Sequence, residues 1–181
     1  MELLLIRHLP TEWNISGFLQ GSQDIPLLPV IDEDLAKLEE NKKVISSFQP
    51  EIVVASQLKR TQQTALHYGF PNPFVEPLLN ELNFGKYEGI EKKHLLQVEE
   101  WISDPKSLIL GERLSDFEKR IFRFLSKYDH FTRILVFGHG SWIRALLSLN
   151  QIGSIKEMNQ IEVHNNELIY LTINQQLLQL G

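Results

Sequence analysis

The first fourteen residues, MELLLIRHLPTEWN (1–14), decide the fold that the sequence predicts. Residues 2–6 are almost entirely apolar, which is typical of a strand that is buried on both faces of a sheet. Arg7 and His8 follow this strand without a spacer. Because ligands of open α/β sheets bind at the carboxyl ends of the strands, we expect this pair to lie at a binding edge.

The rest of the chain alternates between short apolar segments and longer stretches with helical spacing. Segments rich in Val, Ile, Leu, Phe and Tyr lie at 52–55, 73–76, 133–137 and 167–173. Helical spacing occurs at 58–68, 90–101 and 114–128, in a segment capped by Asp32 with Leu35, Leu38 and Ile45 on one face, and in one that begins near Ser141. This alternation predicts a three-layer α/β fold, with a mostly parallel sheet flanked by helices. We expect a single domain over residues 1–181.

The composition narrows the possible functions. The chain is 43% hydrophobic and contains no cysteine, which excludes disulfides and thiolate chemistry. Its net charge of -5 argues against a general affinity for nucleic acid. We find neither a signal peptide nor an apolar run long enough to cross a bilayer, so we expect a cytoplasmic protein with no membrane partner. The sequence leaves the oligomeric state open.

Polar side chains follow the predicted strands and can share one edge of the sheet. They are two arginines, two histidines and one carboxylate: Arg7, His8, Arg60, Glu81 and His139. Arginine forks match phosphate oxygens, a neutral histidine can act as a nucleophile, and a carboxylic acid can protonate a departing alkoxide. This set fits phosphoryl transfer, and backbone amides at the helix start near Ser141 could hold further phosphate charge.

Other chemistries fit the residues less well. Histidines bind Zn²⁺, but the chain has no His-Glu-x-x-His motif, and arginines beside a metal ion would repel it. The stretch 138–142 differs from the serine nucleophile elbow at its centre and at its last position. A Walker loop is not found in the sequence. We therefore expect no metal and no cofactor.

Five blocks in chain order resemble the motifs of one known family and extend over nearly the whole chain. They are Arg7-His8-Leu-Pro-Thr11-Glu-Trp-Asn14, then Gln20-Gly21 with Asp24-Ile-Pro-Leu27, then Ser56-Gln-Leu-Lys-Arg60-Thr-Gln-Gln63-Thr64-Ala65, then Leu79-Asn-Glu81-Leu-Asn-Phe84-Gly85-Lys-Tyr-Glu88-Gly89, and finally His139-Gly140-Ser-Trp-Ile143-Arg144. The pair Gly111-Glu112, before the predicted helix 114–128, is also typical of this family. The sequence thus resembles the histidine phosphatase superfamily, the phosphoglycerate mutase-like proteins, and within it the phosphatase branch.

The resemblance implies a phosphoglycerate mutase-like fold and an activity. The activity is metal-independent hydrolysis of a small phosphorylated metabolite through a phosphohistidine, of the histidine acid phosphatase type. His8 would be phosphorylated, and Glu81 would be the proton donor. Arg7, Arg60 and His139 would surround the phosphate. Asn14, Gln20 and Gly140 are implied as further phosphate or substrate ligands.

One departure from the family pattern keeps alternatives open. Where the family has Gly-Glu after the nucleophile, this chain has Leu9-Pro10. Proline fixes its own φ, and Leu9 adds a side chain that can crowd the pocket. A low-activity protein or a pseudoenzyme that only binds a phosphorylated ligand is therefore one alternative.

Two active alternatives also remain. One is a phosphoglycerate-type mutase, and the other is a phosphatase that acts on phosphohistidine or phosphotyrosine in proteins. The mutase branch typically has Glu-Arg-His-Tyr-Gly at the acid, where this chain has Glu81-Leu-Asn-Phe-Gly85. This difference favours the phosphatase branch.

Overall fold

The structure, a computed structural model, describes residues 1–174 and 177. Within these residues a five-stranded sheet has the order β3-β2-β4-β1-β5. The strands are β1 (Glu2–Arg7), β2 (Ile52–Ala55), β3 (Phe74–Val75), β4 (Arg133–Gly138) and β5 (Leu168–Thr172). The first four strands pair in parallel, whereas β5 runs antiparallel to β1 at the edge. The predicted mostly parallel sheet is confirmed.

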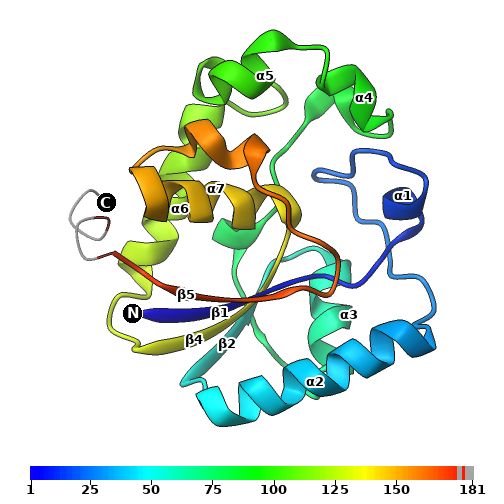
Figure 1. Cartoon of the computed structure of the whole chain (residues 1–181), viewed down its shortest axis with the longest axis vertical. Coiled ribbons are helices and arrows are strands. Elements are labelled where there is room, and N and C mark those ends of the chain that lie inside the picture. Colours follow the sequence, from blue (N-terminus) through cyan, green and yellow to red (C-terminus); the bar gives the residue numbers. More distant parts are fainter. Residues whose placement is uncertain (175–176, 178–181) are drawn as a thin grey trace.

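The central strands are apolar on both faces because each face is covered by helices. In β1, Leu3 and Leu5 pack into one core, while Leu4 and Ile6 pack into a second core. Strand side chains point alternately to opposite faces, so a continuous apolar run serves both cores. This pattern explains why the run at 2–6 has no polar alternation. The three predicted layers are visible in Figure 1.

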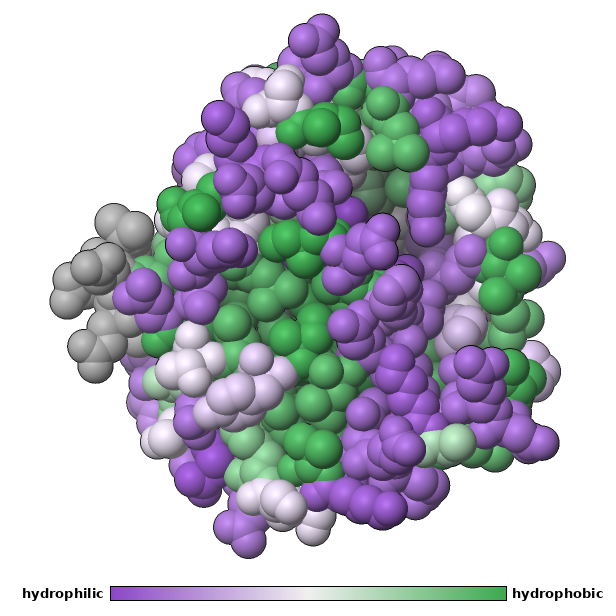
Figure 2. Space-filling model, in the orientation of Figure 1, coloured by the Kyte–Doolittle hydropathy of each residue, from purple (hydrophilic) through white to green (hydrophobic). Residues whose placement is uncertain are grey.

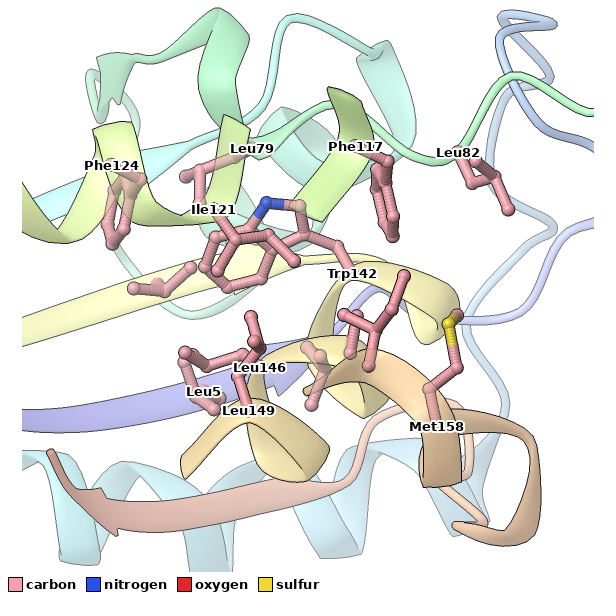
Figure 3. Close-up of a cluster of buried hydrophobic side chains, with 14 of the residues drawn as sticks. Leu5, Leu79, Leu82, Phe117, Ile121, Phe124, Trp142, Leu146, Leu149 and Met158 are labelled. Carbon is pink, nitrogen blue, oxygen red and sulfur yellow. The ribbon is translucent and has the colours of Figure 1, made fainter. Parts of the chain in front are cut away.

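Four longer helices form the two outer layers. They are α6 (Leu114–Lys127) and α7 (Gly140–Ile152) on one side, and α2 (Asp32–Phe48) and α3 (Lys59–His67) on the other (Figure 1). The α6 stripe buries Phe117, Ile121 and Phe124, as its spacing predicts. Figure 3 shows these side chains beside Trp142 of α7. The Phe124 and Trp142 rings meet edge to face, with their centroids 5.3 Å apart.

The remaining described elements are short and lie in the connections. They are α1 (Glu12–Ile15), α4 (Lys92–Leu95) and α5 (Glu99–Ser103), with the 3-10 turns η1 (Pro77–Leu79), η2 (Gly85–Tyr87), η3 (Pro105–Ser107) and η4 (Ile155–Gln160). In the described part of the chain, no helix combines the length and the apolar character needed to cross a membrane.

The predicted helix 90–101 is wrong, because the segment contains two short helices, α4 and α5. Both Leu95 and Trp101 are buried in the same core. Six residues apart on one continuous helix, they would point about 120° away from each other. Val98, with extended backbone at φ -83° and ψ 110°, interrupts the helix so that both side chains reach that core.

The start of α2 also differs from the prediction. Asp32 is the first helical residue, and Ile31 occupies the capping position without a side-chain hydrogen bond. The acidic first turn is favourable at this end because the helix dipole is positive there. Leu35 is 44% exposed, so the buried face begins only at Leu38.

Truncating Phe124 tests whether the α6–α7 contact supports the fold. Phe124→Ala removes a fully buried ring that packs on Trp142. We expect it to lower the free energy of unfolding by about 3–5 kcal/mol. Leu66→Ala in α3, at a side chain that is 57% exposed, is the control and should change it by less than about 0.5 kcal/mol. Equal effects in urea titrations would contradict this description of the core.

Candidate active site

The two histidines leave neighbouring strands at the same edge of the sheet. In the parallel pairing of β1 with β4, Arg7 lies opposite Gly138. His8 and His139 therefore follow on adjacent strands, and the His8 amide donates to the Gly138 carbonyl at 3.1 Å. The ring centroids of the two histidines are 5.4 Å apart. The sequence predicted this juxtaposition from the strand ends.

His8 is held as a neutral imidazole with one nitrogen available. Its Nδ1 lies 2.7 Å from the Leu9 carbonyl oxygen, which can only accept, so Nδ1 carries the proton. Nε2 then has a free lone pair. Burial, followed by the charges of Arg60 and Arg7, holds the pKa of His8 well below its usual 6.5. A neutral imidazole in this state is a competent nucleophile.

Arg60, in the first turn of α3, is fully buried and connects a loop to the second histidine. Its Nη1 donates to the Gln23 carbonyl at 2.6 Å, its Nη2 to the Gly21 carbonyl at 2.8 Å, and its Nε to His139 Nδ1 at 3.3 Å. Because His139 Nδ1 accepts, His139 Nε2 carries the proton and donates to Ser56 Oγ at 2.6 Å. Burial lowers the pKa of Arg60 to about 10, although Glu81 opposes this.

Arg7, the last residue of β1, points its guanidinium along the same edge. Its Nη1 donates to the Val163 carbonyl at 2.6 Å, and its buried Nε has no partner among residues 1–174 and 177. Burial lowers the pKa of Arg7 to about 10. A Cβ at Gly140 would lie 3.3 Å from Arg7 Nε, so glycine leaves room for the close approach of this side chain.

Glu81 reaches the site from the segment between η1 and η2. Its carboxylate accepts hydrogen bonds from the Ser141 amide at 3.0 Å, the Trp142 amide at 3.2 Å and the Leu82 amide at 2.9 Å. The first two amides are at the start of α7, where the helix dipole favours a negative group. The amides near Ser141, which the sequence suggested for a phosphate, here hold Glu81.

Asn14 and Gln20 come from the long connection between β1 and α2. Asn14 Oδ1 accepts from the Thr11 amide at 3.1 Å and from Asn165 Nδ2 at 3.3 Å, which fixes the turn of α1 beside the site. Gln20 is 7% exposed, and its Oε1 is buried without a partner in the described part of the chain. Both side chains face the cavity that the site surrounds.

This cavity has a volume of about 460 Å³. Seven of the eight predicted site residues line it: Arg7, His8, Asn14, Gln20, Arg60, Glu81 and Gly140. His139 is completely buried behind His8 and does not line the cavity. In Figure 2 the surface is hollowed below α4 and beside α1, with hydrophilic residues at its border.

Two cations that line the cavity escaped the sequence prediction. Arg144 is one helical turn after Gly140 in α7, and burial lowers the pKa of its guanidinium. The signal was present, because residues four apart on a helix share a face. Lys92 comes from α4, and burial and then the charge of Arg7 lower its pKa. Leu95, Leu96 and Trp101 add an apolar wall on the same side.

The side chain of Leu9 does not crowd the cavity, contrary to the possibility raised by the sequence. Leu9 is 1% exposed and packs with Leu4, Ile6 and Ala65 in the core between the sheet and helices α2 and α3. Its amide donates to Thr64 Oγ1 at 3.0 Å. The Leu9 half of this departure from the family pattern is therefore absorbed by the core, whereas Pro10 is half-buried outside it.

The charges around the cavity favour an anion. Four cationic side chains line it (Arg7, Arg60, Lys92 and Arg144), against two carboxylates, Glu81 and Glu162. Guanidinium forks suit phosphate and carboxylate ligands. Within residues 1–174 and 177, no group of three His, Cys, Asp or Glu side chains is placed to hold a metal ion.

A three-layer α/β fold with a neutral histidine, guanidinium groups and a carboxylate around a cavity at the carboxyl edge of its sheet is the arrangement of a histidine-dependent phosphoryl-transfer protein. The comparisons agree. The family model described as the histidine phosphatase superfamily (branch 1) matches residues 3–180, and the chain belongs to this superfamily.

Its relatives include phosphatases and mutases. The protein named "Putative phosphoserine phosphatase 2" from Hydrogenobacter thermophilus is 30% identical over 161 residues, which are 81% of this chain and 77% of the relative. The crystal structure of the alpha-ribazole phosphatase from Shigella flexneri superposes with a TM-score of 0.76 at 25% identity, covering 97% of this chain and 92% of that one. A 2,3-bisphosphoglycerate-dependent phosphoglycerate mutase of Bartonella henselae is 27% identical over 92% of this chain and 86% of its own.

The protonation of His8 gives a test by pH titration. Because burial and two arginines hold its pKa well below 6.5, the imidazole should stay neutral as the pH falls through that value. The unfolded chain takes up this proton and the folded chain does not, so the free energy of unfolding should decrease below about pH 6.5. The protonation state of the His8 ring is followed by its NMR resonance across a pH titration, and the resonance is assigned by its loss in His8→Ala. A titration midpoint near pH 6.5 would contradict the described environment.

Proposed function

We propose that this protein is a phosphatase that hydrolyses small phosphomonoesters through a phosphohistidine on His8. One observation carries the proposal: a neutral, buried imidazole whose Nδ1 is fixed by the Leu9 carbonyl lies at a cavity that is also lined by Arg7, Arg60 and the Glu81 carboxylate. Its membership of the histidine phosphatase superfamily supports the same reaction class. The phosphatases among its relatives support hydrolysis.

In the first step, His8 Nε2 attacks phosphorus, and the bond between phosphorus and the ester oxygen breaks. Arg7 and Arg60 bind the phosphate oxygens while negative charge on these oxygens increases in the transition state. The buried Arg7 Nε, which has no partner among the described residues, supports this role, because an unpaired buried donor is unfavourable until a ligand binds it. Glu81, as a carboxylic acid, gives its proton to the departing alkoxide. Most of the rate enhancement comes from positioning and charge stabilisation.

In the second step, water attacks the phosphohistidine. Glu81, now a carboxylate, takes a proton from this water as its oxygen bonds to phosphorus. The phosphorus–nitrogen bond breaks, its electron pair returns to Nε2, and inorganic phosphate leaves. His139 stays neutral, since burial, followed by the charge of Arg60, lowers its pKa well below 6.5. It orients Arg60 through their shared hydrogen bond.

We further propose that the protein acts in the cytoplasm on a small phosphorylated metabolite, with an activity of the acid phosphatase type. The lowered pKa of His8 supports activity on the acid side of neutrality, because the nucleophile stays unprotonated there. A cavity of about 460 Å³ suits a small ligand rather than a protein segment. The net charge of -5 disfavours nucleic acid as a partner.

A mutase remains the second candidate because a phosphoglycerate mutase is among the relatives. A pseudoenzyme is less well supported, since Leu9 packs into the core and leaves the cavity open. A mutase would return the phosphoryl group to a second oxygen of the substrate before water enters. The two activities therefore differ in product, and one incubation separates them.

The first test follows the fate of the phosphoryl group. We expect release of inorganic phosphate from small phosphomonoesters, no requirement for 2,3-bisphosphoglycerate, and complete loss of turnover and of acid-labile phosphate on the protein in His8→Ala. Folding of the variant is checked by circular dichroism. Formation of 2-phosphoglycerate from 3-phosphoglycerate without comparable phosphate release would favour the mutase. Unchanged turnover in a folded His8→Ala variant would remove the mechanism.

The second test concerns the proton that Glu81 supplies. Glu81→Gln keeps the size of the side chain but removes the acid. We expect kcat/KM, which reports only the steps up to formation of the phosphohistidine, to fall by about 10²–10⁴-fold for alkyl phosphates and far less for p-nitrophenyl phosphate, because its leaving group needs little protonation. Steady-state kinetics with both substrates give the comparison. Equal losses would indicate a structural role for Glu81.

A further inference from the structure

Glu81 lies in a segment without regular secondary structure, between η1 and η2. Holding one backbone conformation in such a segment is entropically costly and needs specific contacts. Two fully buried leucines provide part of them: Figure 3 shows Leu79, at the end of η1, and Leu82, within the segment, near the side chains of α6 and α7. These apolar contacts hold the segment against the hydrophobic core, but they do not orient its peptide groups.

Arg120 of α6 supplies the missing orientation. Its Nη1 donates to the Leu78 carbonyl at 3.2 Å and to the Asn80 carbonyl at 2.5 Å, and its Nη2 donates to the carbonyl of Glu81 itself at 3.4 Å. One planar guanidinium thus holds three carbonyls toward α6. The Glu81 side chain extends instead to the start of α7, where Ser141 and Trp142 donate to it.

Glu112 completes the contact from the other end of the segment. Its Oε1 accepts from Arg120 Nη2 at 2.9 Å and from the Asn83 amide at 2.9 Å. The ion pair is largely shielded, with the two side chains 17% and 24% exposed. Phe117 packs against the Arg120 guanidinium, with 4.9 Å from Cζ to the ring centroid. Arg120 and Glu112 together therefore form hydrogen bonds with the backbone of residues 78–83 on both sides of Glu81.

We propose that Arg120 is a positioning residue for Glu81, which it acts on through the backbone without contacting substrate. The inference rests on the proposed function, in which Glu81 protonates the leaving group. A misplacement of about 1 Å in a reacting group can cost about 10²-fold in rate. Loss of Arg120 should therefore impair the step that needs this proton and leave phosphate binding by Arg7 and Arg60 intact.

The test uses Arg120→Met, which keeps an apolar stem beside Phe117 but removes every donor. Arg123→Met is the matched control, since Arg123 is exposed on the same helix. We expect Arg120→Met to lower kcat/KM, which reports only the steps up to the phosphohistidine, by about 10–10²-fold for glycerol 3-phosphate and to leave kcat/KM for p-nitrophenyl phosphate nearly unchanged. Inhibition by inorganic phosphate should be unchanged, and Arg123→Met should match the parent protein. Arg120→Lys, which keeps the charge but lacks the fork, should give an intermediate loss.

The remaining outcomes decide against the proposal. Equal losses on both substrates, or weaker inhibition by phosphate, would show that Arg120 supports the whole site and would overturn it. If the parent protein cleaves both substrates while Arg120→Met cleaves them at parental rates, the positioning role alone fails. A parent protein that cleaves neither substrate overturns the proposed function, and this inference with it.

A second variant covers the case in which Arg120→Met does not fold. Glu112→Gln removes the charge of the ion pair but keeps an oxygen that can accept from the Asn83 amide. We expect kcat/KM for glycerol 3-phosphate to fall less than in Arg120→Met, and kcat/KM for p-nitrophenyl phosphate again to stay nearly unchanged. A folded Glu112→Gln protein without this preference would also overturn the proposal.

Discussion

The parallel register between β1 and β4 is the constraint on which the site depends. It sets Arg7 opposite Gly138, so that His8 and His139 leave the sheet side by side. A slip of one residue would turn every side chain of β1 to the other face and remove the pair. Because α7 begins directly after His139, the same register also places the amides that hold Glu81.

Concentrating polar groups at a buried edge is unfavourable unless each is bonded or neutral. The two solutions coexist here. Arg60 keeps its charge and is bonded to the Gly21 and Gln23 carbonyls, in a loop that Glu88 holds through the Ser22 amide at 2.8 Å. The histidines instead stay neutral, because burial and the neighbouring cations disfavour a further positive charge. The same burial thus yields a cationic surface for an anion and an uncharged nitrogen beside it.

Much of this arrangement could be predicted because its signals are local. The two-sided strands follow from apolar runs, and the residues that follow each strand mark the binding edge. The rest depends on contacts between distant parts of the chain. Leu9 turns into the core partly because its amide bonds Thr64, 55 residues away. Arg120 meets the Asn80 carbonyl 40 residues away. The interruption at Val98 follows from a shared core that one helix face could not reach, which no pattern within 90–101 reveals.

The interrupted helix has a consequence for how such a protein diversifies. The residues proposed to act on the phosphate are attached to the sheet and to α3 and α7, whereas another wall of the cavity is built from Lys92, Leu95 and Trp101 on short helices. Short helices in a connection tolerate insertions and exchanges that strands in a buried sheet do not. Under the proposed function, evolution can therefore remodel this wall, and with it the choice of substrate, independently of the cleavage chemistry. One inherited reaction centre can in this way serve unrelated metabolic tasks.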